Sequence, residues 1–127
     1  MINNTEICTD FQYPHCIESC IATLTADTLK LVFHDETVST YDDLTIFVVN
    51  NRVYAKYQTV YMAMDPGVTH WYPINIHLTL STASWTIDNH ICGKLQVEFQ
   101  EIYTDTSGKI TETEIIAFSG QLSAHIQ

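Results

Sequence analysis

Apolar and polar residues alternate one by one along much of this chain. The clearest case is 74–80, where Ile74, Ile76, Leu78 and Leu80 are separated by polar residues. Because successive side chains of a strand point to opposite faces of a sheet, a period of two predicts a strand with one buried face. We expect these four aliphatic side chains to be buried and the polar residues between them to be exposed.

Similar apolar-rich spans recur between turn signals. Turns are predicted at Asn50-Asn51, Asp65–Gly67, Asp88-Asn89 and Thr106–Lys109, because Asn, Asp, Gly and Pro supply the backbone conformations that tight turns require. The strands predicted between and beside them are 28–34, 44–49, 52–64, 74–80, 94–100 and 110–126. Strands of this length joined by turns are typical of an antiparallel meander.

The fold class predicted is mainly β: a single domain over 1–127, built as an antiparallel barrel or a two-sheet sandwich of about seven or eight strands. Residues 1–13 show no clear period and are expected to form a loosely held N-terminal arm or a short edge strand. Pro14 and the spacing of the apolar residues after it are compatible with one short helix over 14–22, while a strand over 17–25 competes with that helix. A curved sheet wrapped on this helix is the main alternative.

Two strands are apolar on both faces. These are 44–49 and the second half of 52–64. One face can belong to the core, and the other then needs a helix, a second sheet layer or another subunit. The sequence therefore predicts a homo-oligomer, most simply a twofold dimer, with Val60, Met62 and Met64 near the contact.

Composition agrees with a β-rich globular domain. The chain is 46% hydrophobic and 16% charged, with 17 Thr, 14 Ile and 8 Val, all residues that strands favour. No apolar run approaches the roughly 18 residues of a membrane span. The net charge is −10, and the five Lys and Arg are scattered singly along the sequence. We expect no binding to nucleic acid or membranes, and one alternative function is an acidic protein that binds or inhibits a basic partner.

The cysteines Cys8, Cys16, Cys20 and Cys92 are too few for a disulfide scaffold. Free or buried thiols are the favoured interpretation, and a local disulfide and a metal site are the alternatives. No complete ligand set with recognised spacing is present, so no metal and no cofactor is predicted. The N-terminus shows no signal-peptide pattern, which leaves the compartment unknown and favours the cytoplasm.

Residues 103–114 partly match a calcium-binding loop, because Asp105, Ser107, Gly108 and Glu114 fall at the expected offsets. The first ligand position carries Tyr103 instead of Asp, and both flanks have the pattern of strands rather than helices. The segment therefore predicts a hairpin turn.

Aromatic residues and methionines are concentrated within 54–72. Tyr and Trp combine a large apolar body with a polar tip, and Met adapts to irregular partners, so such a cluster suits a ligand pocket or an interface as well as a core. The candidate binding residues are Tyr54, Tyr57, Tyr61, Met62, Met64, Trp71 and Tyr72. They predict a noncatalytic binding module that uses a barrel mouth or sheet face for a small apolar ligand or a protein partner.

An enzyme is the less favoured alternative. No Gly-x-Ser-x-Gly elbow and no glycine-rich phosphate loop is present. A small β-barrel enzyme would need a histidine and a carboxylate enclosed together, and the spacing along the chain proposes no such pair.

Overall fold

The computed structural model describes residues 4–9, 15–36, 40–61, 67–82 and 84–127, and over these residues the chain forms nine strands and no helix. The strands are β1 (Glu6–Thr9), β2 (His15–Ile17), β3 (Cys20–Thr25), β4 (Thr28–Glu36), β5 (Thr40–Val49), β6 (Arg52–Tyr61), β7 (Val68–Leu80), β8 (His90–Thr104) and β9 (Ile110–His125). The mainly β class is confirmed, with nine strands where seven or eight were expected.

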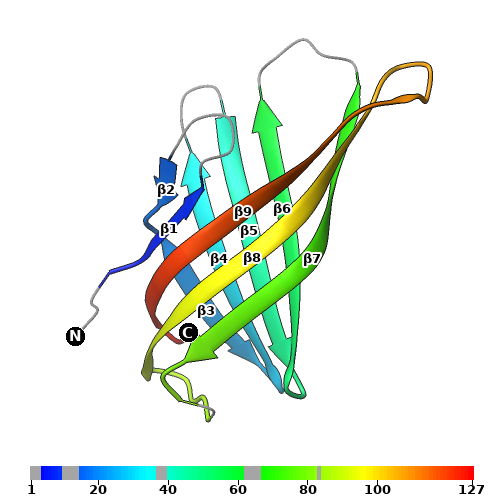
Figure 1. Cartoon of the computed structure of the whole chain (residues 1–127). Coiled ribbons are helices and arrows are strands. Elements are labelled where there is room, and N and C mark those ends of the chain that lie inside the picture. Colours follow the sequence, from blue (N-terminus) through cyan, green and yellow to red (C-terminus); the bar gives the residue numbers. More distant parts are fainter. Residues whose placement is uncertain (1–3, 10–14, 37–39, 62–66, 83) are drawn as a thin grey trace.

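The strands form two antiparallel sheets that face each other (Figure 1). Sheet A has the order β2-β1-β9-β8-β7, and sheet B has the order β3-β4-β5-β6. The β5–β6 and β8–β9 hairpins follow from the turns predicted at Asn50-Asn51 and Thr106–Lys109, since sequential strands joined by tight turns pair with each other.

The N-terminal third differs from the expectation. The short helix over 14–22 is wrong, because His15–Ile17 form β2 and Cys20–Thr25 form β3. Residues 6–9 form the short strand β1, one of the two alternatives, but it lies between β2 and β9 rather than at the sheet edge, with Ile7 fully buried. Pairing with long neighbouring strands satisfies the backbone of these short segments, and this tertiary effect overrides a local helical spacing.

The core lies between the two sheets. Its largest fully buried side chains include Phe33 from sheet B and Phe99 and Phe118 from sheet A, surrounded by aliphatic residues of both sheets. Alternation along each strand directs one side chain in two into this space, as the sequence pattern predicts.

Strand β7 departs from strict alternation at one point. The pairing of β7 with β8 shifts register between Pro73 and Asn75, and as a result Ile74 is 47% exposed. The expectation that Ile74 is buried is therefore wrong. Ile76, Leu78 and Leu80 pack against the core but are only half-buried where burial was expected, and Asn75 and His77 between them are exposed, as expected. The bulge is explained by position, since β7 is an edge strand and Pro73 has no N–H to donate.

Backbone hydrogen bonds join the two sheets at one side of the part of the molecule that the structure describes. The end of β9 runs beside β3, where Gln127 N donates to Ala22 O at 2.9 Å and Leu24 N donates to Gln127 O at 3.1 Å. On the opposite side, β6 ends sheet B and β7 ends sheet A. No backbone hydrogen bond joins these two edge strands in the part of the chain that the structure describes.

Gly120 lies where β1 crosses close to β9. A Cβ atom at this position would overlap the carbonyl oxygen of Glu6. The sequence predicts a bend or a close backbone approach at this glycine, and the close approach is confirmed. It allows β1 to join sheet A and to bury Ile7.

Candidate functional site

Four of the seven candidate binding residues have side chains that the structure describes, and these four lie in two environments. Tyr54 and Tyr72 lie on the surface, 50% and 51% exposed, whereas Tyr57 is buried and Trp71 is half-buried inside. The side chain of Tyr61, and Met62 and Met64 altogether, lie outside the described residues. These four described side chains do not form one cluster. Alternation along β6 and β7 sends neighbouring aromatic residues to opposite faces.

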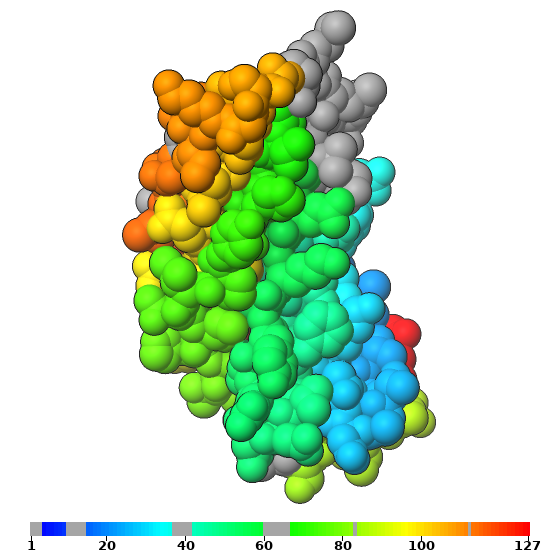
Figure 2. All heavy atoms as spheres, turned by 90° about the vertical axis from the view of Figure 1, so that its right-hand side faces the viewer, coloured from blue at the N-terminus to red at the C-terminus, as the bar shows by residue number. Residues whose placement is uncertain are grey.

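A groove lies on the surface between the edge strands β6 and β7. It has a volume of about 410 Å³ and is lined by Val53, Tyr54, Ala55, Pro73, Ile74 and Ile76. Figure 2 shows this side of the molecule, with the two strands forming adjacent columns of atoms. Two of these lining residues, Tyr54 and Ile74, are large apolar side chains that are about half exposed. This concentration marks the groove as a candidate binding site.

Positive charge surrounds Tyr54. Arg52 and Lys56 flank it on the outward face of β6, and Phe47 lies directly opposite it on β5. Lys30 lies opposite Phe47 on β4, with its Nζ atom 6.0 Å from the centre of the Phe47 ring. We call these five residues the Tyr54 patch.

The Tyr54 patch contains three of the five Lys and Arg residues in the chain, although the net charge is −10. Their side chains are exposed, and none of the three forms an ion pair with a carboxylate that the structure describes. Along the sequence the cations are scattered singly. Strand register brings Lys30 next to Phe47, which in turn lies next to Tyr54, and register is not visible from positions along the chain.

The interior aromatic pair anchors the core near one end of the sheets. The rings of Tyr57 and Trp71 meet edge to face, with centroids 5.3 Å apart. Trp71 Nε1 donates to Glu101 Oε2 at 2.8 Å, and the Tyr57 hydroxyl donates to Asp42 Oδ1 at 2.9 Å. Both polar tips thus have carboxylate partners, as buried Tyr and Trp generally require. These two residues support the fold and orient Asp42.

A histidine and a carboxylate are enclosed together beside this pair. His15 Nε2 lies 3.1 Å from Asp42 Oδ2, and the two side chains are 33% and 13% exposed. His15 comes from β2 in sheet A and Asp42 from β5 in sheet B, so the contact bridges the sheets. This is the kind of pair that the enzyme alternative requires, and the sequence spacing of 27 residues gave no signal for it.

A second histidine cluster lies on the outer face of sheet B. His34 contacts Asp43 and Glu36 through its two ring nitrogens. The hydrogen bond to Asp43 raises the pKa of His34, and burial opposes that shift only in part. Because this cluster is more exposed than the His15 pair, it provides a natural comparison for it.

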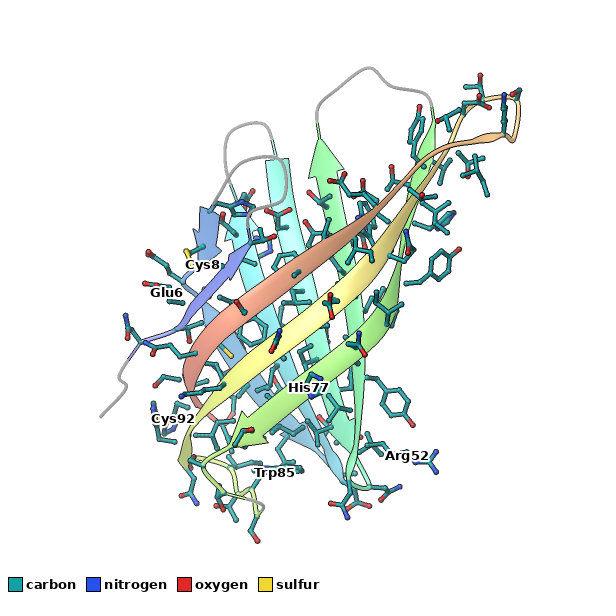
Figure 3. The ribbon with its side chains drawn as sticks, in the orientation of Figure 1. Glu6, Cys8, Arg52, His77, Trp85 and Cys92 are labelled. Carbon is teal, nitrogen blue, oxygen red and sulfur yellow. A yellow bond between two sulfur atoms is a disulfide. The ribbon has the colours of Figure 1, made fainter. Side chains whose placement is uncertain are left out.

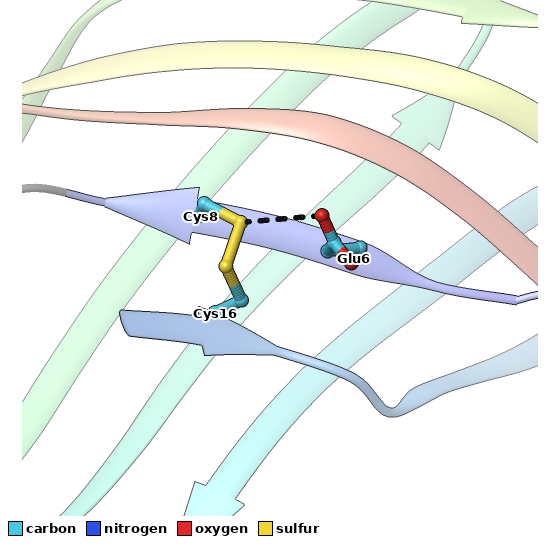
Figure 4. Close-up of side chains that lie close together, drawn as sticks. All are labelled: Glu6, Cys8 and Cys16. Carbon is cyan, nitrogen blue, oxygen red and sulfur yellow. Dashed lines mark hydrogen bonds between the residues drawn. A yellow bond between two sulfur atoms is a disulfide. The ribbon is translucent and has the colours of Figure 1, made fainter. Parts of the chain in front are cut away.

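Cys8 and Cys16 form a disulfide between the adjacent strands β1 and β2 (Figure 4). The local disulfide was one of the open alternatives, and this bond removes both residues from any thiolate ligand set. Glu6 Oε1 lies 3.9 Å from Cys8 Sγ, a contact in which the disulfide sulphur has no proton to donate. Cys20 and Cys92 are free thiols, and burial raises the pKa of Cys20 to about 12.

A polar hollow lies on the outer face of sheet A. It has a volume of about 520 Å³, and its lining includes His77, Lys94, Gln96 and Gln121. Figure 3 shows His77 on β7 at this face. Leu95 is the large apolar residue of this lining, and its side chain is buried in the core.

The segment at 103–114 is a hairpin turn between β8 and β9, as predicted. Asp105 Oδ1 accepts hydrogen bonds from the Ser107 hydroxyl at 2.6 Å, from Ser107 N at 2.9 Å and from Lys109 N at 3.0 Å. The Ser107 hydroxyl and the Lys109 N–H are the main causes that lower the pKa of Asp105. This carboxylate therefore closes the turn.

Comparisons with known proteins add no relative: no family model, no curated protein and no solved structure matches the chain. Within the described ranges, no helix is long and apolar enough to cross a membrane. The function is therefore argued from the chemistry of the side chains described above.

Proposed function

We propose that this chain is a two-sheet sandwich that acts as a noncatalytic binding module, and that its site is the Tyr54 patch with the adjoining β6–β7 groove. The main support for the proposal is that three cationic side chains lie around Phe47 and Tyr54, beside an apolar groove. None of the three forms an ion pair with a carboxylate that the structure describes. Tyr and Arg are the residues most enriched among those that dominate binding energy at protein interfaces.

The ligand that fits this chemistry is a segment of a partner protein that carries aromatic or aliphatic residues flanked by carboxylates. Its apolar side chains would contact Tyr54 and Ile74, and its carboxylates would meet Lys30, Arg52 and Lys56. Opposite charges at the rim favour encounter and orientation, while the desolvated aromatic contact supplies most of the affinity. A small apolar ligand would use the groove but would leave the cations without a role.

Selection of random peptides displayed on phage tests the proposal. We expect the enriched peptides to combine aromatic residues with an excess of Asp and Glu. Tyr54→Ala should weaken binding of a synthetic selected peptide by at least about 2 kcal/mol, or about 30-fold, when measured by fluorescence polarisation.

The matched control is Ile110→Ala, which truncates another exposed apolar side chain. Ile110 begins β9 in sheet A, whereas the Tyr54 patch lies on sheet B. This variant should bind the peptide as the unmodified protein does. Selected peptides without an excess of carboxylates, or peptides that bind Tyr54→Ala with unchanged affinity, would refute the assignment.

Self-association is a second candidate use of the outer face of sheet B. Ile21 and Phe47 are apolar side chains that remain partly exposed on this face. The cations lie toward one end of the face, and Asp43 and Glu36 lie toward the other. An antiparallel twofold contact would therefore pair opposite charges around an apolar centre. The contact expected at Val60, Met62 and Met64 involves side chains outside the described residues.

Sedimentation velocity at micromolar concentration tests self-association. We expect a dimer that Phe47→Glu converts to monomer, because the substitution places a carboxylate in the apolar centre of the contact. The control is Ile115→Glu, which adds the same charge at an exposed position of sheet A. A species of 14.5 kDa for the unmodified chain excludes the dimer and leaves the face free for another protein.

A further inference from the structure

Three potential metal ligands meet at one end of the space between the sheets. They are His15 of β2, Asp35 of β4 and Asp42 of β5, and one ligand atom from each lies within 4.8 Å of the others. Metal–ligand distances of about 2.0–2.2 Å place two ligands of one ion at most about 4.4 Å apart. The three atoms are therefore close to the separation that a single ion requires.

Strand alternation explains why these side chains converge. His15 is two residues before Ile17, which is fully buried, so it lies on the inward face of β2. Asp35 and Asp42 likewise lie two residues from Phe33 and from a buried leucine on β5, and thus on the inward faces of β4 and β5. The cluster therefore joins sheet A to sheet B across the interior.

The two carboxylates repel each other, and a bound cation would relieve this repulsion. Asp35 and Asp42 are directly opposite each other in the β4–β5 pairing. Like charges at directly opposite positions of an antiparallel pair are destabilising. Asp42 has His15 beside it, and among the described residues no Lys or Arg forms an ion pair with either aspartate.

A surrounding hydrogen bond fixes the orientation of one ligand. The Tyr57 hydroxyl donates to Asp42 Oδ1 at 2.9 Å, which leaves Oδ2 directed toward His15. Tyr57 is held in turn by rings of the core, namely Trp71, Phe99 and Phe118. Hydrogen bonds of this kind, from a residue that does not touch the ion, orient ligands at protein metal sites and tune their affinity.

We propose that His15, Asp35 and Asp42 bind a divalent transition-metal ion, with Zn²⁺ as the preferred occupant. One imidazole nitrogen and two carboxylate oxygens form a donor set that suits Zn²⁺, whereas Ca²⁺ takes oxygen ligands. Water or a group from a ligand completes the coordination. This site is separate from the Tyr54 patch, and it departs from the expectation of no metal because its ligands come from three strands that the sequence does not place together.

Calorimetric titration with ZnCl₂, CaCl₂ and CoCl₂ tests the site. We expect one Zn²⁺ per chain, weaker or no binding of Ca²⁺, and a visible absorption spectrum of bound Co²⁺ with nitrogen and oxygen ligands. His15→Gln and Asp35→Asn should each weaken Zn²⁺ binding by at least tenfold. Tyr57→Phe keeps the ring and loses the hydroxyl, and should weaken it about tenfold.

The matched control is His34→Gln, which removes a histidine that also contacts two carboxylates but lies on the outer surface. It should leave Zn²⁺ affinity unchanged. Circular dichroism verifies that each variant is folded. His15 and Asp35 belong to different sheets, so if one of these two variants fails to fold, the other still tests the site. The proposal is wrong if the unmodified protein binds no Zn²⁺ at a protein concentration of about 0.1 mM, where any Kd below the millimolar range is detected. It is also wrong if His34→Gln abolishes Zn²⁺ binding and the His15 and Asp35 variants do not.

Discussion

Replacing Phe99 with alanine should lower the free energy of unfolding by about 3–5 kcal/mol. Phe99 is fully buried on β8, and its ring lies 6.2 Å from that of Phe118 and 5.7 Å from that of Tyr57. The substitution removes apolar surface from the core and leaves a cavity between strands of both sheets, which rigid sheets fill poorly.

Denaturant-induced unfolding measures this loss, with Ile115→Ala as the control. Ile115 is a strand residue that is 56% exposed, and its truncation should change stability by no more than about 0.5 kcal/mol. A loss below about 1 kcal/mol for Phe99→Ala would mean that the two sheets do not enclose this residue.

Replacing both Cys8 and Cys16 with serine should lower the free energy of unfolding by about 2–3 kcal/mol. The bond closes a short loop between residues eight apart in sequence, and it fixes β2, which is attached to sheet A through β1 alone. Without the bond, the unfolded chain gains conformational freedom and the edge strand that carries His15 is less firmly held.

Unfolding curves with and without reductant provide the measurement. Reductant should lower the stability of the unmodified protein to that of the double variant and leave the variant unchanged.

Alkylation of the unfolded, unreduced protein should label two cysteines, Cys20 and Cys92. In the folded protein Cys92 should react before Cys20, because burial raises the pKa of Cys20 to about 12 and keeps it a thiol at neutral pH. Four labelled cysteines would show that the disulfide is absent.

The disulfide also bears on the compartment. Such bonds persist in oxidising compartments and are rare in the cytosol. Detection of the Cys8–Cys16 bond in protein isolated from its source without reductant would therefore indicate an oxidising compartment.

The β content and the long hairpins were predictable because their signals are local. Alternation over 28–34 and the turn at Asn50-Asn51 each depend on a few neighbouring residues, and the structure forms β4 and the β5–β6 turn there. Asn50 and Asn51 both adopt positive φ angles, the backbone conformation that a tight hairpin turn of this kind requires.

The candidate site was predictable only in part, because it depends on pairing between strands. Tyr54 and Tyr72 were identified from composition, but Lys30 joins Tyr54 only through the registers of β4 with β5 and of β5 with β6. The His15 and Asp42 pair likewise joins two sheets. Each such contact is set by tertiary structure, so no spacing along the chain reveals it.

The errors have the same origin. The apolar spacing after Pro14 fits one helical face, yet β1 and β4 provide partners for β2 and β3 that a local pattern does not include. The exposure of Ile74 results from a bulge on an edge strand, and Pro73 was the residue that could have indicated it.

The most direct test of the binding proposal is to follow the backbone amide signals of ¹⁵N-labelled protein by NMR during titration with a selected acidic, aromatic peptide. The binding proposal predicts that the shifted signals map to Phe47, to 52–56 on β6 and to 72–76 on β7, while signals of Lys94 on β8 and Gln121 on β9, which line the hollow on the outer face of sheet A, stay in place. Shifts confined to Lys94 and Gln121, or to the interior end near His15, would contradict it.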